Sequence, residues 1–231
     1  MIRGKTVLAV VPARGGSKGV PLKNLQSVWG RSLISHAAEV VRAAGIFDRT
    51  VVSTDHREIA NEARKNGLDA PFVRPAELSG DLVGDHPVML HALDETEALD
   101  EKRYDVIVML QPTCPQRRAE HVVGAVEKLL GEGWDAVWTV SQSDLKYHPQ
   151  KALTVGEDDR MDYYDVSGRS VVARQQLRPV YYRNGAAYAI TREALRVGSS
   201  LKPERTGALI IDEPFVSIDT AEDFLTLGNI R

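Results

Sequence analysis

The chain of 231 residues lacks the features that mark several classes of protein. It contains one cysteine, which excludes an intramolecular disulfide framework and a zinc site built on cysteines. Its apolar runs fall well short of the roughly 20 residues that a membrane span requires. The opening MIRGKTVLAVVPARGG reaches proline, arginine and glycine too early for a signal peptide. We therefore expect a soluble, cytoplasmic protein with no membrane partner.

An excess of basic charge is also missing. The 29 Lys and Arg residues against 32 Asp and Glu give a net charge of -3, so no broad positive field draws the protein to nucleic acid. The six histidines show no metal-ligand spacing. A chain of this length can form one large α/β domain, or one domain that carries a smaller appendage, and bury a substantial core. An enzyme or a small-molecule-binding protein remains.

Short runs rich in Val, Ile and Leu alternate with segments of helical periodicity. The runs are typical of strands covered on both faces, and they lie at 6–11, 50–53, 104–110, 135–140 and 214–218. Apolar residues share one helical face in two of the segments between them: Leu33, Ala37, Val40, Val41 and Ala44, then Ala119, Val122, Val126 and Leu129. Asp55 with Glu58, and Thr220 with Asp223, have the spacing of capping boxes. The alternation predicts an α/β fold with a Rossmann-like, doubly wound, mostly parallel sheet.

The segment 141–182 interrupts this pattern. It is rich in charged residues and tyrosines, has little regular period, and is too long for a bare connection in a compact domain. We interpret it as an inserted subdomain that serves as a lid or a subunit contact. Residues 1–140 and 183–231 then form the α/β core.

The loop that follows the first predicted strand has the composition of an anion site. Ligands of open parallel sheets lie outside the carboxyl ends of the strands. Here residues 12–24 combine three glycines with the cations Arg14, Lys18 and Lys23. Glycines let backbone amides converge on an anion, and the cations add charge-assisted hydrogen bonds, which suits a polyphosphate. The loop matches neither GxGxxG nor GxxxxGKS. The alternative is a solvated basic turn.

Other predicted strand ends add further candidates. Gln111 can read an amide or a nucleobase edge with one donor and one acceptor. Cys114 has no evident histidine partner, so a packing role is favoured over a nucleophile. Asp219 precedes a helix capped by Thr220 and could hold Mg²⁺ beside a phosphate, or simply favour the helix dipole. The clusters 174–178 and 183–186 are either substrate contacts or solvated surface.

Taken together, the motifs resemble the acylneuraminate cytidylyltransferase family, which comprises CMP-sialic acid synthetases and bacterial relatives for legionaminic and pseudaminic acids. The resemblance spans residues 5–228 and rests on seven motifs in the family's order: ARGGSKGVPLKN, VSTDHREIA, FVRPAELSGD, QPTCPQR, RQQL, RNGAAY and SIDTAEDF. It implies a Rossmann-like fold with an inserted dimerisation region, hence a homodimer. It also implies CTP and a nine-carbon sugar acid as substrates.

The resemblance also assigns residues. It implies that the loop binds CTP through Arg14, Gly15, Ser17, Lys18, Lys23 and Asn24, with Arg74 also in the nucleotide pocket. Sugar-acid contacts fall on Gln111, Arg174 and Asn184, and a magnesium ligand falls on Asp219. Of these, Lys23, Arg14 and Asp219 are the expected catalytic residues.

Two departures and three alternatives qualify this reading. The family's QPTSPLR is here QPTCPQR, and its Asp-Ile-Asp is here Ser217-Ile218-Asp219, which removes one of two metal-site carboxylates and puts a second Mg²⁺ in doubt. A catalytically weak paralogue that binds nucleotide or sugar is one alternative. An enzyme for the eight-carbon acid KDO is another, although its relatives carry Ser-Thr-Arg-Leu-Pro where this chain has Ser-Lys-Gly-Val-Pro. A sugar 1-phosphate nucleotidyltransferase would carry a Leu-x-Gly-Gly-x-Gly loop, which is absent.

Overall fold

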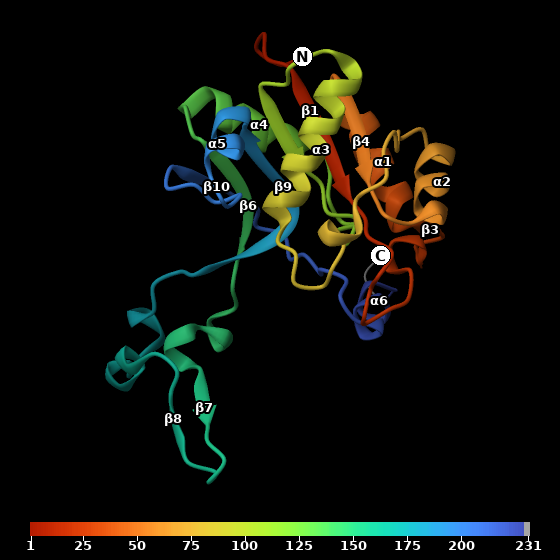
Figure 1. The fold of residues 1–231 in the computed structure, drawn as a ribbon. Helices are drawn as coiled ribbons and strands as arrows, with labels where there is room; N and C mark the ends of the chain where they lie inside the picture. Colours follow the sequence, from red (N-terminus) through yellow and green to blue (C-terminus); the bar gives the residue numbers. More distant parts are fainter. Residues whose placement is uncertain (229–231) are drawn as a thin grey trace.

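A six-stranded sheet forms the centre of the protein (Figure 1). The computed structural model describes residues 1–228. The strand order is β10-β6-β9-β5-β1-β4, and β9 runs antiparallel to both of its neighbours while the other pairs are parallel. The strands of this sheet are β1 (Val7–Pro12), β4 (Arg49–Ser53), β5 (Val106–Met109), β6 (Ala136–Gln142), β9 (Tyr181–Thr191) and β10 (Thr206–Ile210).

Helices cover both faces of the sheet. One face packs against α1 (Leu33–Ala44), α2 (Arg57–Lys65) and α4 (Ala119–Glu132), and the other against α3 (Asp85–Asp100) and α5 (Arg192–Val197). Successive residues of β1 alternate between the two cores, with Val7 and Ala9 in one and Leu8 and Val10 in the other. Burial on both faces explains the continuous apolar runs in the sequence. The predicted Rossmann-like, mostly parallel α/β fold is confirmed.

Two helices predicted from periodicity are confirmed as α1 and α4. The last predicted strand is wrong, because residues 214–218 form no strand. Phe215 and Ile218 are buried there. The alternation of apolar residues therefore marks buried side chains, although the segment does not pair with a strand of the sheet. The sheet ends instead with β10, and the long strand β9 lies where the sequence indicated only a polar cluster at 183–186.

The two predicted capping boxes have different outcomes. Before α6 (Ala221–Gly228), the amide of Thr220 donates to the Asp223 carboxylate, and the amide of Asp223 donates back to Oγ1 of Thr220, as predicted. At α2 the prediction is wrong, because the helix is preceded by His56 and no side chain caps it. Oδ1 of Asp55 accepts instead from the amide of Gly15, 2.8 Å away.

The chain leaves the sheet after β6 and returns in β9, and the intervening residues 143–180 project from the body as an arm (Figure 1). The arm contains the two-stranded hairpin of β7 (Leu153–Val155) and β8 (Met161–Tyr163) and several short 3₁₀ helices. Every residue of both hairpin strands is exposed. A second small ribbon, β2 (Ser27–Val28) with β3 (Arg31–Ser32), precedes α1. Within residues 1–228, no helix is both long and apolar enough to cross a membrane.

Candidate active site

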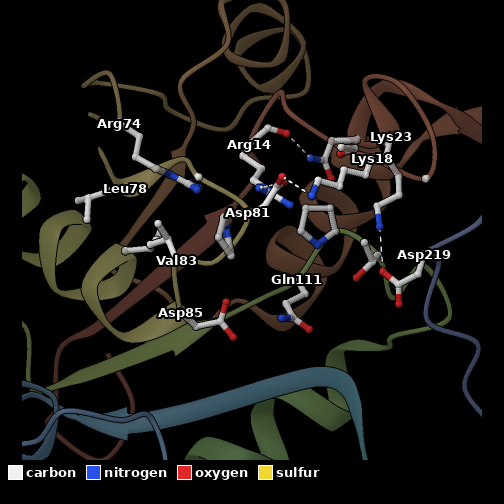
Figure 2. Close-up of a pocket in the computed structure, with 18 residues that line it drawn as sticks. Arg14, Lys18, Lys23, Arg74, Leu78, Asp81, Val83, Asp85, Gln111 and Asp219 are labelled. Carbon is white, nitrogen blue, oxygen red and sulfur yellow. Dashed lines mark hydrogen bonds and ion pairs between the residues drawn. The ribbon is translucent and has the colours of Figure 1, made fainter. Parts of the chain in front are cut away.

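A cavity of about 430 Å³ opens at the carboxyl end of the parallel strands (Figure 2). Its walls come from four segments: the loop after β1, the segment from Arg74 to the first turn of α3, the loop after β5, and Asp219 just before α6. These are the positions where open α/β sheets bind ligands. The cavity brings together eight of the residues singled out from the sequence: Arg14, Ser17, Lys18, Lys23, Asn24, Arg74, Gln111 and Asp219.

Close backbone approaches hold the loop after β1 in place. Side-chain Nδ2 of the buried Asn24 donates to the carbonyl of Arg14 at 3.1 Å, which closes the loop on itself. A Cβ at Gly19 would lie 2.3 Å from the carbonyl oxygen of Asp219, and a Cβ at Gly15 would lie 2.8 Å from the His56 ring. Glycine is therefore required at both positions, and Gly19 lets the loop reach the segment that carries Asp219.

A carboxylate stands between two of the loop cations. Nη1 of Arg14 lies 2.7 Å from Oδ1 of Asp81, and Nζ of Lys18 lies 2.8 Å from Oδ2 of the same residue. Hydrogen bonds from Lys18 and Arg14 lower the pKa of Asp81, so it is ionised at neutral pH. Figure 2 shows Asp81 pointing toward both cations. The pairing places one negative charge between the two cations.

The third loop cation reaches the opposite wall. Nζ of Lys23 donates to the carbonyl of Ile218 at 2.7 Å and lies 2.9 Å from Oδ1 of Asp219 (Figure 2). The lysine side chain is 14% exposed, whereas that of Asp219 is 71% exposed. Lys23 therefore joins the loop after β1 to the segment before α6.

The far end of the cavity is less polar. Leu78 and Val83 lie there with Arg74 (Figure 2), whose side chain is buried and donates from Nε to Oγ of Ser53 at 3.0 Å. Burial lowers the pKa of Arg74 to about 10, with the nearby Asp55 opposing that shift, so the guanidinium stays charged at neutral pH. An apolar wall beside a fixed cation suits a flat heterocycle that carries hydrogen-bond acceptors.

Gln111 lines the cavity, and Asn184 lies behind it. Gly185 has a positive φ of 76°, and a Cβ there would lie 3.2 Å from Oε1 of Gln111, so this glycine makes room for the glutamine. Asn184 is 1% exposed. Its Oδ1 accepts from Thr139 at 2.7 Å, and its Nδ2 donates to Ser141 at 3.0 Å. The structure thus places Asn184 in the sheet, outside the cavity.

Two further residues from the sequence analysis also lie outside this cavity. Arg174 is in the arm, in the 3₁₀ helix Arg174–Gln176, and lines a separate hollow there. Cys114 is 1% exposed and packs with Ala186, Ile211 and Phe215, and burial raises the pKa of its thiol to about 11. The predicted packing role of Cys114 is confirmed.

A second cavity of about 400 Å³ adjoins the first, and Asp85 lines both. The guanidinium of Arg183 lies over the Trp138 ring at 5.6 Å, and Trp138 meets Tyr188 edge-on with ring centroids 5.1 Å apart. Burial raises the pKa of Asp85, although Arg183 and Arg74 oppose the shift. This cavity offers a cation, aromatic surfaces and a carboxylate.

The sequence analysis missed Asp81 and Asp85 as site residues. Asp81 ends the motif FVRPAELSGD, so its position in that motif was the available signal. Asp85 is the first residue of α3, where acidic residues are common because they favour the helix dipole. No pattern in the sequence separates that ordinary role from a place in a cavity.

The donor set is compatible with one divalent cation held jointly with phosphate oxygens. Within residues 1–228, no group of three or more His, Cys, Asp or Glu side chains is arranged to hold a metal alone. Mg²⁺ typically binds through one or two carboxylates together with substrate phosphates. Asp219 is exposed at the cavity and engages only Oδ1 with Lys23, which leaves Oδ2 available. Ser217 is exposed and is not among the cavity-lining residues of the described chain.

Comparisons with known proteins agree with this geometry. The family model for cytidylyltransferases matches residues 8–216. A pseudaminic acid cytidylyltransferase of Campylobacter jejuni is 31% identical over 220 residues, which cover 94% of this chain and 92% of the relative. An N-acylneuraminate cytidylyltransferase of Streptococcus agalactiae is 32% identical over 224 residues, which cover 94% of this chain and 51% of the relative.

The fold has a counterpart among solved structures. A CMP:2-keto-3-deoxy-manno-octonic acid synthetase complexed with CTP superposes with a TM-score of 0.69, over 96% of this chain and 97% of the other, at 17% identity. This likeness concerns the fold. Because the family model covers most of the chain and runs through the loop after β1, the chain belongs to the cytidylyltransferase family.

Proposed function

We propose that this protein transfers a cytidylyl group from CTP to a nine-carbon 2-keto sugar acid and releases pyrophosphate. One observation carries the proposal: Arg14, Lys18 and Lys23 come from one loop and line one cavity whose other end is apolar and holds Arg74. Such a cavity matches a nucleoside triphosphate, with phosphates at the cations and the base at the apolar end. The sugar class follows from the relatives named for pseudaminic acid and N-acylneuraminate. Because the reaction consumes CTP, we place it in the cytoplasm.

In this reaction the anomeric hydroxyl of the sugar acid attacks the α-phosphorus in line, and pyrophosphate leaves. Catalysis then depends on positioning and on neutralising charge. Arg14 and Lys18 must exchange Asp81 for phosphate oxygens, and Lys23 must share its charge between Asp219 and the nucleotide. Gln111, at the end of β5, faces the same cavity and can orient the sugar acid by its amide.

The proposal includes Mg²⁺ held by Asp219 and the phosphates. When bound, the ion supplies positive charge to the triphosphate and polarises the phosphoryl oxygens. The free Oδ2 of Asp219 and its exposure at the cavity support this assignment. Lys23 keeps the Asp219 carboxylate beside the loop.

Release of pyrophosphate tests the function. The protein is incubated with CTP, Mg²⁺ and, in separate reactions, nine-carbon sugar acids, KDO and sugar 1-phosphates. We expect turnover with at least one nine-carbon acid. Turnover with KDO or a sugar 1-phosphate alone would assign a different acceptor. Binding of CTP without turnover on any acceptor would identify a weak paralogue.

We also propose that the arm forms a homodimer contact with a second copy of the chain. The arm presents exposed apolar side chains with no cover from the body: Leu153, Val155, Met161, Tyr164, Val166 and Val172. An exposed apolar patch of this kind usually marks an interface. Arg174 lies on the same arm. In a dimer of this kind, we expect the arm to carry this arginine toward the cavity of the second copy.

Sedimentation at micromolar concentration tests the dimer. We expect the wild type to sediment as a dimer and the double variant Met161→Asp, Val172→Asp to shift toward a monomer. Val197→Asp changes an exposed apolar residue on α5, outside the arm, and is expected to leave the dimer intact. A fully active wild-type monomer would contradict this proposal.

A further inference from the structure

The segment that carries Asp219 reaches the cavity without secondary structure of its own. Strand β10 ends at Ile210, and residues 211–220 form neither a helix nor a strand before α6 begins. The carboxylate of Asp219 nevertheless lies 2.9 Å from Nζ of Lys23. Contacts with other parts of the chain must therefore hold this segment in place.

The side chain of Gln116 supplies two of these contacts. Its Oε1 accepts from the amide of Val216 at 2.8 Å, and its Nε2 donates to the carbonyl of Pro214 at 3.5 Å. A strand of a parallel sheet likewise offers its neighbour both an acceptor and a donor. The carboxamide of Gln116 thus takes the place of a neighbouring strand, beside a segment whose sequence alternates like a strand.

A third contact lies on the same edge of the segment. The amide of Ile218 donates to the carbonyl of Thr113 at 3.0 Å. The three bonded residues of the segment are spaced by two along the chain, as are the bonded residues on one edge of a strand. This edge lies against the loop after β5, in which Gln111 lines the cavity. Gln116 therefore joins two walls of the cavity.

Other contacts hold the two ends of the segment. At α6, the Asp223 carboxylate accepts from the amide of Asp219 at 2.8 Å. At the far end, Arg118 pairs with the Glu213 carboxylate, but both side chains are about half exposed, and such pairs contribute little to stability. Gln116 lies between these ends and bonds to the backbone, so it determines the path of the chain toward Asp219.

We propose that Gln116 is a positioning residue that sets the place of the Asp219 carboxylate relative to the cations of the loop after β1, an inference that rests on the proposed cytidylyl transfer. Gln116 is not among the described residues that line the cavity, so it acts through the segment. The family's QPTSPLR has a leucine at this position, which can make neither bond. Without the carboxamide, the carboxylate that would receive Mg²⁺ is held less closely beside Lys23.

Amide hydrogen exchange in the protein without metal or nucleotide tests the positioning. Gln116→Leu keeps a side chain of similar size and removes both bonds. We expect the Val216 amide to exchange about 3- to 10-fold faster, and the Ile218 amide, which Gln116 does not contact, to change with it. The Ile211 amide, bonded to Val140 on β6, should keep its wild-type rate. Faster exchange at Val216 alone would show a local bond and overturn the proposal.

The consequence for the reaction is measured as the Mg²⁺ concentration that gives the half-maximal rate at saturating CTP. We expect this concentration to rise about 3- to 10-fold in Gln116→Leu, while kcat at saturating Mg²⁺ stays within about twofold of wild type. A lower kcat with an unchanged half-maximal concentration would indicate a general structural fault and overturn the proposal. Gln142→Leu, at the exposed glutamine that ends β6, is the matched control and should behave as wild type in both measurements.

Two further variants keep the test decisive. Gln116→Glu keeps the oxygen that accepts from Val216 and loses the donor to Pro214, so it should lie between wild type and Gln116→Leu in both measurements. A glutamate variant as impaired as the leucine variant would overturn the role of the Val216 bond. If Gln116→Leu does not fold by circular dichroism, Gln116→Asn replaces it, because its side chain is one methylene shorter and cannot span both groups.

The failure of the proposed function and the failure of this inference are distinguishable. Wild-type turnover is measured first, and its absence with every acceptor refutes the proposed function, while the exchange rates still decide whether Gln116 holds the segment. An active wild type beside a Gln116→Leu variant with unchanged exchange rates and unchanged magnesium dependence refutes the positioning role alone.

Discussion

Lys23 and Asp219 are 196 positions apart in the sequence, yet Nζ of the lysine lies 2.9 Å from Oδ1 of the aspartate. The same Nζ donates to the carbonyl of Ile218. The lysine expected to bind phosphate and the carboxylate expected to bind magnesium therefore form one unit.

This unit leads to the first prediction, which concerns Lys23→Ala. The change removes a cation that would stabilise charge on the transferring phosphate, so we expect kcat to fall about 10²–10³-fold. The fold should survive, because the loop keeps the Asn24 bond to the Arg14 carbonyl. Steady-state kinetics with CTP and circular dichroism check both statements. Lys65→Ala, an exposed lysine at the end of α2, is the control. Near-normal activity of Lys23→Ala would remove the phosphate-loop assignment.

The second prediction concerns Asp81, which pairs with Arg14 and Lys18. A nucleotide must displace this carboxylate to reach the cations. Asp81→Asn removes the competing charge, so we expect CTP to bind about 2- to 5-fold more tightly, the range set by exposed ion pairs. Calorimetric titration measures the dissociation constant. Weaker binding would instead mean that Asp81 contacts the nucleotide or its cation.

The sequence was informative where the residues of a candidate site lie close together along the chain. Arg14, Lys18 and Lys23 lie within ten positions on one loop. The glycines between them indicate a backbone that approaches other groups closely, as Gly19 approaches Asp219. The strands β1 and β5 could be predicted because both of their faces are buried. A short, continuous apolar run is typical of such a strand.

The sequence was uninformative where contacts between distant segments of the chain determine the local structure. The strand β9 contains Arg183, Asn184 and Gly185, which are unusual in a buried strand, and it is stable because Asn184 bonds to Thr139 and Ser141 on β6. Residues 214–218 alternate like a strand, but the amide of Ile218 pairs with the carbonyl of Thr113 outside any ladder. Asp85 reaches the cavity from another segment of the chain, and only the packing of α3 on the sheet places it there.

The third prediction concerns acid stability. Burial of Glu97 on α3 disfavours its charge, but hydrogen bonds from Arg192, the Tyr104 amide and Arg196 outweigh burial and lower its pKa to about 2, from an ordinary value of 4.5. A lowered folded pKa stabilises the fold above the unfolded pKa, and this contribution is lost as pH falls from about 4.5 toward 2.

Glu97→Gln should therefore cost on the order of 2 kcal/mol at pH 7, the usual range for hydrogen bonds to a charged group, and much less near pH 2. Urea unfolding at several pH values measures the difference. Glu95→Gln, an exposed site on the same helix, should leave stability nearly unchanged at every pH. A constant difference between Glu97→Gln and wild type across this pH range would contradict the assigned ion pairs.

The last prediction concerns magnesium at Asp219 and Ser217. Asp219→Ala removes the cavity carboxylate that precedes α6 and also leaves Lys23 without its partner, so we expect turnover to be nearly abolished. Ser217 is an exposed neutral side chain two positions earlier, and a neutral ligand binds a divalent ion more weakly than a carboxylate. Ser217→Asp should therefore lower the Mg²⁺ concentration that gives the half-maximal rate.

Initial rates measured over a magnesium titration at saturating CTP compare wild type with both variants. An active Asp219→Ala variant would remove the metal assignment. An identical titration curve for Ser217→Asp would mean that position 217 does not face the ion, which would agree with its absence from the cavity wall in the described chain. A lower half-maximal concentration would instead show that the serine in this chain weakens a metal site that a second carboxylate can restore.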